Sequence, residues 1–353
     1  MRKFLPSLFI ILFFSCQNEP QISTSKFSRI AGKTMGTTYH ITYEDESGRN
    51  FKKEVDSILV EINKAVSTYI PDSEISIFNK SEKGKLIGIG EHFKNVLLNS
   101  EIVHTEANGY FDPTVMPLVN YWGFGYTAKK PVLQVDSLAI DSIQNFVGWE
   151  NIIYGDAIDE LNDTLISPFI KILSKNYSNT QLDFSANAKG YGVDVIFNFF
   201  QEKNLKNYLV EIGGELRTSG KNAKGKLWTT AINTPKINAQ LNDYEAIIKV
   251  KNKAIATSGN YRNFHEVNGE WYGHEINPKT GFPEENNLLS VTIMADDCMS
   301  ADAYATAMMV MGLEKSKVLV EKLNNIDAFF IFANEAGELE TFYTKGFAGT
   351  IVE

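Results

Sequence analysis

The stretch Asp296-Asp297-Cys298-Met299-Ser300-Ala301-Asp302-Ala303-Tyr304-Ala305-Thr306 is the most informative part of this chain. It follows an apolar run that predicts a strand over 289–295, and it leads into an apolar helix predicted over 300–311. Asp302 and Thr306 lie four residues apart, so we expect their oxygens on one helix face. A carboxylate and a hydroxyl that share a face suit Mg²⁺, which prefers oxygen ligands. Two structural alternatives stay open: Asp302 complements the helix dipole, and Thr306 bonds back to its own helix.

A second stretch, Leu182-Asp183-Phe184-Ser185-Ala186-Asn187-Ala188-Lys189-Gly190-Tyr191, predicts a strand over 181–184, a turn over 185–190 and a helix over 191–203. A helix N-terminus after such a turn can receive a phosphate, and Lys189 would add a charged contact. The alternative is a plain helix cap in which Gly190 permits close packing. The chain contains neither a phosphate-loop motif (GxxxxGKS or GxxxxGKT) nor a GxGxxG dinucleotide motif.

His274 is the main candidate for acid–base chemistry. It lies in the segment 271–283, where an Asn-Pro pair and a Thr-Gly pair predict a tight turn. An imidazole held at such a turn can act as a general base near neutral pH, and the alternative is a purely structural histidine. His265 is a weaker candidate. The five histidines show no zinc-ligand spacing, and no Ser-His-Asp or Cys-His arrangement can be identified.

The segment 110–125 is rich in aromatic residues and contains two prolines. This composition predicts an ordered, partly buried loop that either binds a flat ligand or contributes to the core. The formal net charge is −9 at pH 7, and the chain has no run of lysine and arginine, which argues against a nucleic-acid partner. Cys298 is expected to be a small buried residue and not a nucleophile.

The N-terminus predicts export. Arg2 and Lys3 precede a short apolar core that ends at Ser15-Cys16, and this order resembles a bacterial lipoprotein signal. We therefore expect a signal peptide over 1–15, lipidation of Cys16 and a polar tether over 16–28. An ordinary secretory signal and an uncleaved anchor are the alternatives. Acyl chains on Cys16 would hold the protein at a bacterial membrane surface, facing the periplasm or the exterior, without spanning the membrane.

Residues 29–353 are expected to form a single folded domain. Strands are predicted over 208–212, 215–219, 228–232, 245–250 and 253–257, and helices are inserted between the strands in blocks. Strands that succeed strands favour an α+β fold with mixed or antiparallel sheets over a doubly wound parallel sheet.

These blocks together resemble the ApbE family of FAD:protein FMN transferases, a family of lipoproteins with a fold related to the T-fold. The resemblance extends from Met35-Gly36-Thr37-Thr38-Tyr39 to about Gly312. Its blocks occur in the family order: 35–39, 67–76, 111–125, 182–194, 209–220, 254–263, 274–283 and 288–312.

The resemblance implies a cleft between two lobes that binds FAD and Mg²⁺. It implies transfer of FMN to a Thr or Ser hydroxyl of a partner protein, with release of AMP, and flavin-accepting membrane subunits of NADH:quinone reductase-type or related electron-transfer complexes as partners. By motif position His274 would be the base. The Mg²⁺ ligands would be the side chains of Asp302 and Thr306 and the carbonyls of Ala186 and Ala305. The implied FAD contacts are Met35, Tyr69, Tyr110, Phe111, Asp112, Asp183, Lys189 and Ile276.

Two competing hypotheses share most of these residues. An FAD pyrophosphatase would use water in place of the acceptor hydroxyl and would release FMN and AMP. A non-catalytic flavin-binding lipoprotein would have no need of both the Asp302 and Thr306 pair and His274.

Overall fold

The computed structural model describes residues 26–127, 134–156, 158–159, 164–165, 171–236, 243–260, 264–267, 270–284 and 286–352, without the side chains of 156–171 and 261–271. The signal peptide and Cys16 therefore lie outside the described residues, as does the side chain of His265. The first strand begins at Phe27, so the last two residues assigned to the tether belong to the sheet.

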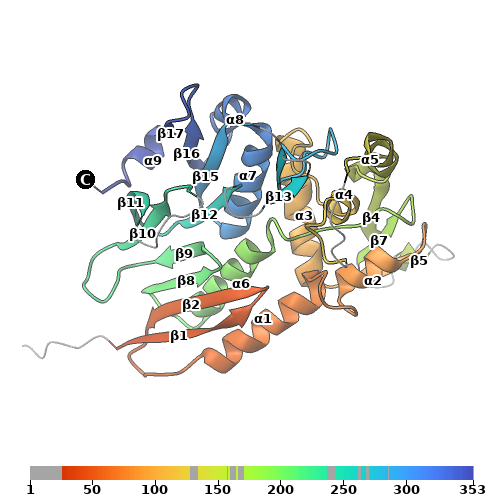
Figure 1. Cartoon of the computed structure of the whole chain (residues 1–353). Helices are drawn as coiled ribbons and strands as arrows, with labels where there is room; N and C mark the ends of the chain where they lie inside the picture. Colours follow the sequence, from red (N-terminus) through yellow and green to blue (C-terminus); the bar gives the residue numbers. More distant parts are fainter. Residues whose placement is uncertain are drawn as a thin grey trace, which may run out of the picture.

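An eight-stranded sheet in which every neighbouring pair is antiparallel forms the centre of the molecule (Figure 1). Its spatial order is β1-β2-β8-β9-β12-β15-β16-β17. Gly213 and Gly214, both at positive φ, make the tight turn between β8 and β9. The strands are β1 (Phe27–Thr34), β2 (Thr37–Glu44), β8 (Tyr208–Ile212), β9 (Glu215–Ser219), β12 (Ala254–Gly259), β15 (Leu288–Ala295), β16 (Asp327–Ala333) and β17 (Leu339–Tyr343).

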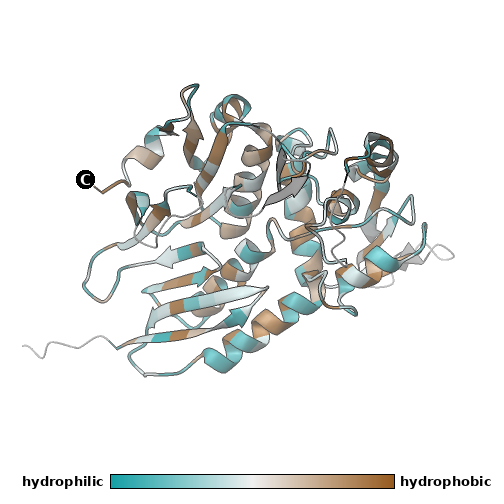
Figure 2. Cartoon of the chain, viewed as in Figure 1, coloured by the Kyte–Doolittle hydropathy of each residue, from teal (hydrophilic) through white to brown (hydrophobic). Residues whose placement is uncertain are grey.

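Helices cover one face of this sheet. Helix α1 buries one stripe of apolar residues, including Val55, Leu59 and Ile62, and Figure 2 shows it with both teal and brown residues, as expected of an amphipathic helix. Helices α6 and α7 pack on β8, β9, β12 and β15, and α7 is apolar nearly all round because α3 also packs against it. The helices are α1 (Lys52–Val66), α2 (Glu74–Lys80), α3 (Glu91–Glu106), α4 (Met116–Tyr121), α5 (Ser137–Gln144), α6 (Ala188–Glu202), α7 (Cys298–Met311), α8 (Leu313–Val320) and α9 (Lys345–Ala348), with the 3₁₀ turn η1 (Trp149–Asn151).

A hairpin and the last helix cover the opposite face. Ile232 and Ile248 of the hairpin and Phe347 of α9 pack against Ile255 and Ile331 of the large sheet. The part of the sheet around β12 and β15 is thus buried on both faces, which is why these two strands contain no charged residue. The hairpin strands are β10 (Trp228–Asn233) and β11 (Tyr244–Val250).

A smaller sheet, with the spatial order β3-β7-β4, lies beside α2, α3 and α5 (Figure 1). Its bounds are β3 (Ile87–Ile89), β7 (Lys171–Lys175) and β4 (Ile152–Asp156). The remaining short strands are β5 (Ile158–Asp159), β6 (Thr164–Leu165), β13 (Phe264–Val267) and β14 (Glu270–Gly273). Along the part of the chain that the structure describes, no helix is both long and apolar enough to cross a membrane.

The predicted α+β class with antiparallel sheets is confirmed, but the strand predicted over 181–184 is wrong. Only an isolated bridge joins Gln181 to Val115. The reason is a side chain that takes the place of a neighbouring strand: Asn79 Nδ2 donates to the Leu182 carbonyl at 2.9 Å, and the Leu182 N–H donates to Asn79 Oδ1 at 2.7 Å. A side-chain partner of this kind leaves no signal in an alternating apolar pattern.

Two helices begin earlier than predicted, and the difference concerns the site. Helix α6 begins at Ala188, so Lys189 and Gly190 lie in its first turn and not in a preceding loop. Helix α7 begins at Cys298, because the side chain of Asp297 caps it by accepting the Ser300 N–H at 2.8 Å. Asp302 therefore lies just beyond the first turn of α7.

Candidate active site

A cavity of about 650 Å³ opens where the segment 110–126, the start of α6, the end of β12 and α7 meet. Its volume is in the range of small-molecule sites. Its wall combines parts of the large sheet, such as Glu215 and Thr257, with segments outside that sheet, such as Met116 of α4 and Asp183 before α6. This confirms a cleft between two parts of the domain. The predicted site residues that line it are Tyr69, Tyr110, Phe111, Asp112, Asp183, Ala186, Lys189, His274, Ile276, Asp302 and Thr306.

Two residues named for the site do not line the cavity. The side chain of Ala305 is fully buried in the core beneath α7, so only its backbone could contribute a ligand. Met35 lies at positive φ in the turn between β1 and β2 and lines a separate groove beside α1. Its turn nevertheless lies near the site through Gly213, because a Cβ on Gly213 would lie 2.8 Å from Thr37 Cγ2 and 3.3 Å from Lys189 Cδ. Gly213 thus lies between the 35–39 block and Lys189.

Charged groups converge at the deep end of the cavity. Lys189 Nζ donates to Glu215 Oε1 at 2.5 Å and lies 3.8 Å from Asp302 Oδ1. The Gly190 N–H donates to Asp302 Oδ2 at 3.0 Å. Asp302 and Glu215 are each only 3% exposed, so two carboxylates and one ammonium group share a site largely shielded from water.

This burial changes the titration of all three groups. Burial raises the pKa of Glu215 to about 8, and the neighbouring Asp302 carboxylate adds to the shift. Burial also raises the pKa of Asp302, while Lys189 opposes that rise. Burial alone would lower the pKa of Lys189, but the Asp302 and Glu215 carboxylates outweigh it and hold that pKa above its usual value. Lys189 therefore stays charged.

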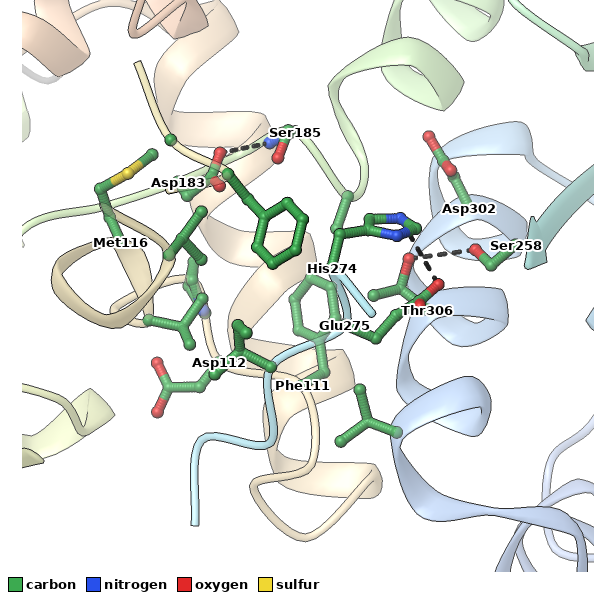
Figure 3. Close-up of a pocket in the computed structure, with 18 of the residues that line it drawn as sticks. Phe111, Asp112, Met116, Asp183, Ser185, Ser258, His274, Glu275, Asp302 and Thr306 are labelled. Carbon is green, nitrogen blue, oxygen red and sulfur yellow. Dashed lines mark hydrogen bonds and ion pairs between the residues drawn. The ribbon is translucent and has the colours of Figure 1, made fainter. Parts of the chain in front are cut away.

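Oxygen atoms suited to a hard cation lie beside this cluster. Thr306 Oγ1 and Ser258 Oγ are hydrogen-bonded at 3.2 Å (Figure 3). Thr306 therefore has a hydrogen-bond partner outside its own helix. Among the described residues, Glu215 Oε2 is buried without a hydrogen-bond partner. A buried polar oxygen without a partner is costly unless a ligand or cation completes it.

His274 faces the cavity next to a third buried carboxyl group, that of Glu275. His274 Nε2 lies 3.6 Å from Glu275 Oε1, and the Phe124 ring packs edge-on at 6.3 Å between centroids. Figure 3 shows His274, Glu275, Ser258 and Thr306 toward one side of the cavity and Asp183 and Met116 toward the other. Burial raises the pKa of Glu275, and the nearby imidazole opposes that shift.

The side chains of Asp112 and Asp183 hold loops in shape. Asp112 Oδ1 accepts the Thr114 N–H at 2.8 Å and the Thr114 hydroxyl at 2.6 Å, and burial raises the pKa of Asp112. Asp183 Oδ1 accepts the Ser185 N–H at 2.9 Å, which sets the turn into α6. Asp112 thus offers the cavity mainly its backbone.

Glu215, Ser258 and Glu275 line the cavity, but the sequence analysis assigned them no role. The signal for Glu215 was available in principle, because it directly follows Gly213-Gly214 at the start of a strand in which Leu216 and Thr218 are also buried. A charged residue at such a position is unusual without a partner. Ser258 and Glu275 carried no comparable signal.

Gly190 makes the close approach of α6 and α7 possible. A Cβ added at Gly190 would lie 2.3 Å from the Cys298 carbonyl oxygen, a backbone atom that cannot move alone. We expect Gly190→Ala to lower the free energy of unfolding by about 2 kcal/mol, because steric overlap outweighs the gain in helix propensity. Urea unfolding measures this. Gly192→Ala in the same helix is the control, since it would meet only the flexible ends of Met35 and Ile212 and should cost less. Equal stability of the two variants would contradict the expected overlap.

Comparison with known proteins identifies the family of this chain. Residues 35–330 match the model of the ApbE family. This chain belongs to the ApbE family. It is 36% identical over 92% of its length to the FAD:protein FMN transferase of Haemophilus influenzae, covering 90% of that relative. The solved flavin transferase ApbE from Vibrio cholerae superposes with a TM-score of 0.80 at 33% identity, over 92% of this chain and 99% of the other. The apo flavinyl transferase ApbE of Pseudomonas stutzeri gives 0.79 at 31% identity, over 92% of this chain and 96% of the other.

Proposed function

We propose that this protein transfers the FMN part of FAD to a Thr or Ser hydroxyl of an acceptor protein, with AMP as the leaving group. The observation that carries this proposal is that one cavity is lined by two kinds of group. The aromatic residues Tyr110, Phe111 and Phe124 suit a planar ring, and the charged residues Lys189 and Asp302 suit phosphates and a cation. Membership of the ApbE family and the names of its curated relatives support the same reaction.

We include Mg²⁺ in the proposal, held by the Asp302 and Thr306 side chains and the carbonyls of Ala186 and Ala305. The donor set fits, because the oxygens are those that Mg²⁺ prefers and the unpartnered Glu215 Oε2 is a further buried carboxyl oxygen nearby. Among the described residues no group of three or more His, Cys, Asp or Glu side chains gathers as a metal cluster. Mg²⁺ sites commonly use one or two carboxylates and leave positions for substrate phosphates. When bound, the ion would neutralise charge on the diphosphate.

The chain's own residues account for the remaining chemistry. His274 accepts the proton of the acceptor hydroxyl while the hydroxyl oxygen attacks the phosphorus on the FMN side of FAD. A phosphorus–oxygen bond forms to the acceptor, the bond between the two phosphates breaks, and AMP leaves with the electron pair. Lys189, held charged by its two carboxylate neighbours, stabilises negative charge on the phosphates. The burial of this end of the cavity strengthens those interactions.

We further propose that the acceptor is a membrane subunit of an NADH:quinone reductase-type or related electron-transfer complex, met at a bacterial membrane surface. The support is the sequence from Arg2 to Cys16, which matches a lipoprotein signal, and the acidic net charge, which does not favour nucleic acid.

The test is to incubate the full-length chain in detergent with FAD, Mg²⁺ and a purified acceptor domain. Flavin fluorescence that stays with the denatured acceptor, together with the mass of one added FMN unit, would support transfer. An acceptor whose target Thr is replaced by Val is the control. Free FMN and AMP without labelled acceptor would indicate a pyrophosphatase, and bound FAD without turnover would indicate a carrier. Either result would overturn the proposal.

A further inference from the structure

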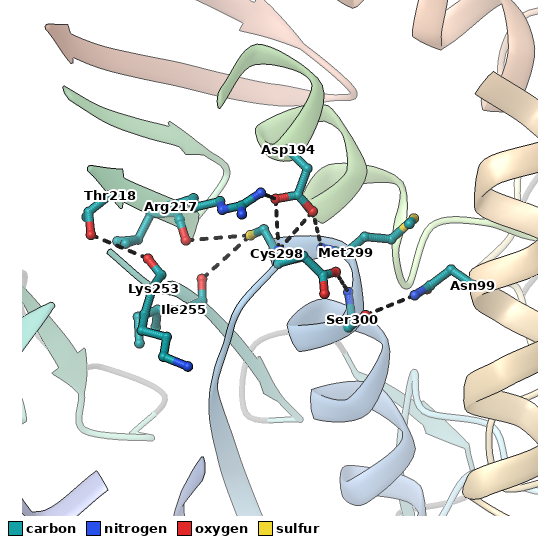
Figure 4. A network of polar contacts seen from close by, with 11 residues as sticks. Asn99, Asp194, Arg217, Thr218, Lys253, Ile255, Cys298, Met299 and Ser300 are labelled. Atoms are coloured by element: carbon teal, nitrogen blue, oxygen red, sulfur yellow. Dashed lines mark hydrogen bonds and ion pairs between the residues drawn. The ribbon is translucent and has the colours of Figure 1, made fainter. Parts of the chain in front are cut away.

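Helices α6 and α7 each provide a carboxylate that accepts backbone N–H groups at the N-terminal end of the other helix. Asp302 of α7 accepts the Gly190 N–H of α6 at 3.0 Å. In return, Asp194 of α6 accepts the Cys298 N–H, at 3.0 Å and 2.8 Å to its two oxygens, and the Met299 N–H at 2.8 Å (Figure 4). The first N–H groups of a helix have no acceptor within the helix, and a carboxylate there also complements the helix dipole. Each helix therefore satisfies the N-terminus of the other.

The two carboxylates of this exchange differ in their surroundings. Asp302 lines the cavity, whereas Asp194 and Arg217 do not. Arg217 of β9 donates to Asp194 Oδ1 at 2.7 Å, and its guanidinium group lies 4.0 Å from the centroid of the Phe197 ring. Arg217 thus holds the orientation of Asp194 from the side of the sheet. Burial raises the pKa of Asp194 to about 6 despite the opposing charge of Arg217, so at pH 8 Asp194 is ionised.

A polar chain from α3 holds the other side of α7. Asn99 Nδ2 donates to Ser300 Oγ at 3.1 Å, and Asn187 Nδ2 donates to Asn99 Oδ1 at 3.2 Å. Asn187 directly follows Ala186, whose carbonyl is a proposed metal ligand. The first turn of α7 is therefore fixed from α3, α6 and β9 together. Because a helix is stiff, fixing this turn also fixes the direction of Asp302 and Thr306.

We propose that Asp194, oriented by Arg217, is a positioning residue that sets the place of α7 and so aims Asp302 and Thr306 at the cation site. This inference rests on the Mg²⁺ site of the proposed function. Asp194 acts through the Cys298 and Met299 N–H groups and touches neither FAD nor the metal. Its loss should weaken metal binding while every ligand stays in the chain, and groups that orient metal ligands typically contribute about 10- to 100-fold in affinity.

The test measures Mn²⁺ binding to the full-length protein by electron paramagnetic resonance, at pH 8 and with FAD present. We expect Asp194→Asn to raise the Mn²⁺ dissociation constant about 10- to 100-fold, because one amide oxygen replaces two charged acceptors. Arg217→Gln, which leaves Asp194 in place but free to turn, should give a smaller rise in the same direction and covers the case in which Asp194→Asn does not fold. Asp297→Asn is the matched control, since asparagine caps a helix as well as aspartate does.

The outcomes separate this inference from the proposed function. Wild-type binding that Asp302→Asn abolishes establishes the metal site. Given that result, wild-type affinity in folded Asp194→Asn, or in Arg217→Gln if the former does not fold, overturns the positioning role. A lower melting temperature with unchanged Mn²⁺ affinity overturns it as well, because that pattern reports stability alone. Absence of Mn²⁺ binding by the wild type would instead overturn the proposed metal site, and this inference with it.

Discussion

Asp302→Asn is expected to lower the FAD- and Mg²⁺-dependent transfer rate by about 10³-fold or more, equivalent to ~4 kcal/mol of transition-state stabilisation. The substitution keeps the size of the side chain and one oxygen that can still accept the Gly190 N–H. It removes the negative charge that makes the oxygen a strong cation ligand and that lies 3.8 Å from Lys189. The loss should therefore appear in turnover and metal binding with little change in the far-ultraviolet circular dichroism spectrum.

The control for this prediction lies on the same helix. Asp297→Asn makes the same chemical change at the residue that caps α7, where asparagine serves equally well. Asp297 is not among the residues that line the active-site cavity. We expect its turnover to stay within about threefold of wild type, since a cap substitution of this kind changes stability only slightly. If Asp302→Asn retained full Mg²⁺-dependent turnover, the assignment of Asp302 as a metal ligand would be wrong.

His274→Ala is expected to lower the rate of flavin transfer about 10²- to 10⁴-fold, the range for loss of a general base. The dissociation constant of FAD should change far less, because the aromatic wall and Lys189 stay in place. Rapid-quench measurement of the labelled acceptor gives the first quantity, and fluorescence titration of FAD gives the second.

His40→Gln is a suitable control for the histidine variant. His40 lies on β2, is paired with Glu211 at 2.8 Å and does not line the cavity, so transfer should proceed at the wild-type rate. A His274→Ala variant that lost FAD affinity but kept its turnover at saturating FAD would show that His274 binds the substrate and is not the base.

Much of the fold could be predicted because its signals are local. The helix over 52–66, for example, has apolar residues at a helical period. The hairpin of β8 and β9 follows from alternating residues on either side of Gly213-Gly214. The strand predicted over 181–184 was wrong because the hydrogen-bond partner of this segment is the side chain of Asn79, more than a hundred residues away. Local periodicity contains no information about such a partner.

The candidate site was predictable only where residue type and spacing already suggest chemistry. Asp302 and Thr306 share a helix face, so their convergence follows from the helical repeat. Glu215 is different, because its importance depends on the 2.5 Å contact with Lys189 and on burial, and neither is visible before the strands and helices pack. The same is true of Asp194, which reads as an ordinary polar residue of α6 until the N-terminus of α7 is placed against it.

The sequence by itself determined the α+β class, the blocks typical of the ApbE family and a set of site residues, most of which line the cavity, because each is encoded by composition, period or motif over a few residues. The tertiary structure alone decided how the stretch from Asp296 to Thr306 meets the stretch from Leu182 to Tyr191. Gly190 lets two helix N-termini approach so closely that each carboxylate, Asp302 and Asp194, accepts N–H groups of the other helix. That exchange depends on unsatisfied backbone groups more than a hundred residues apart, and only packing brings them together.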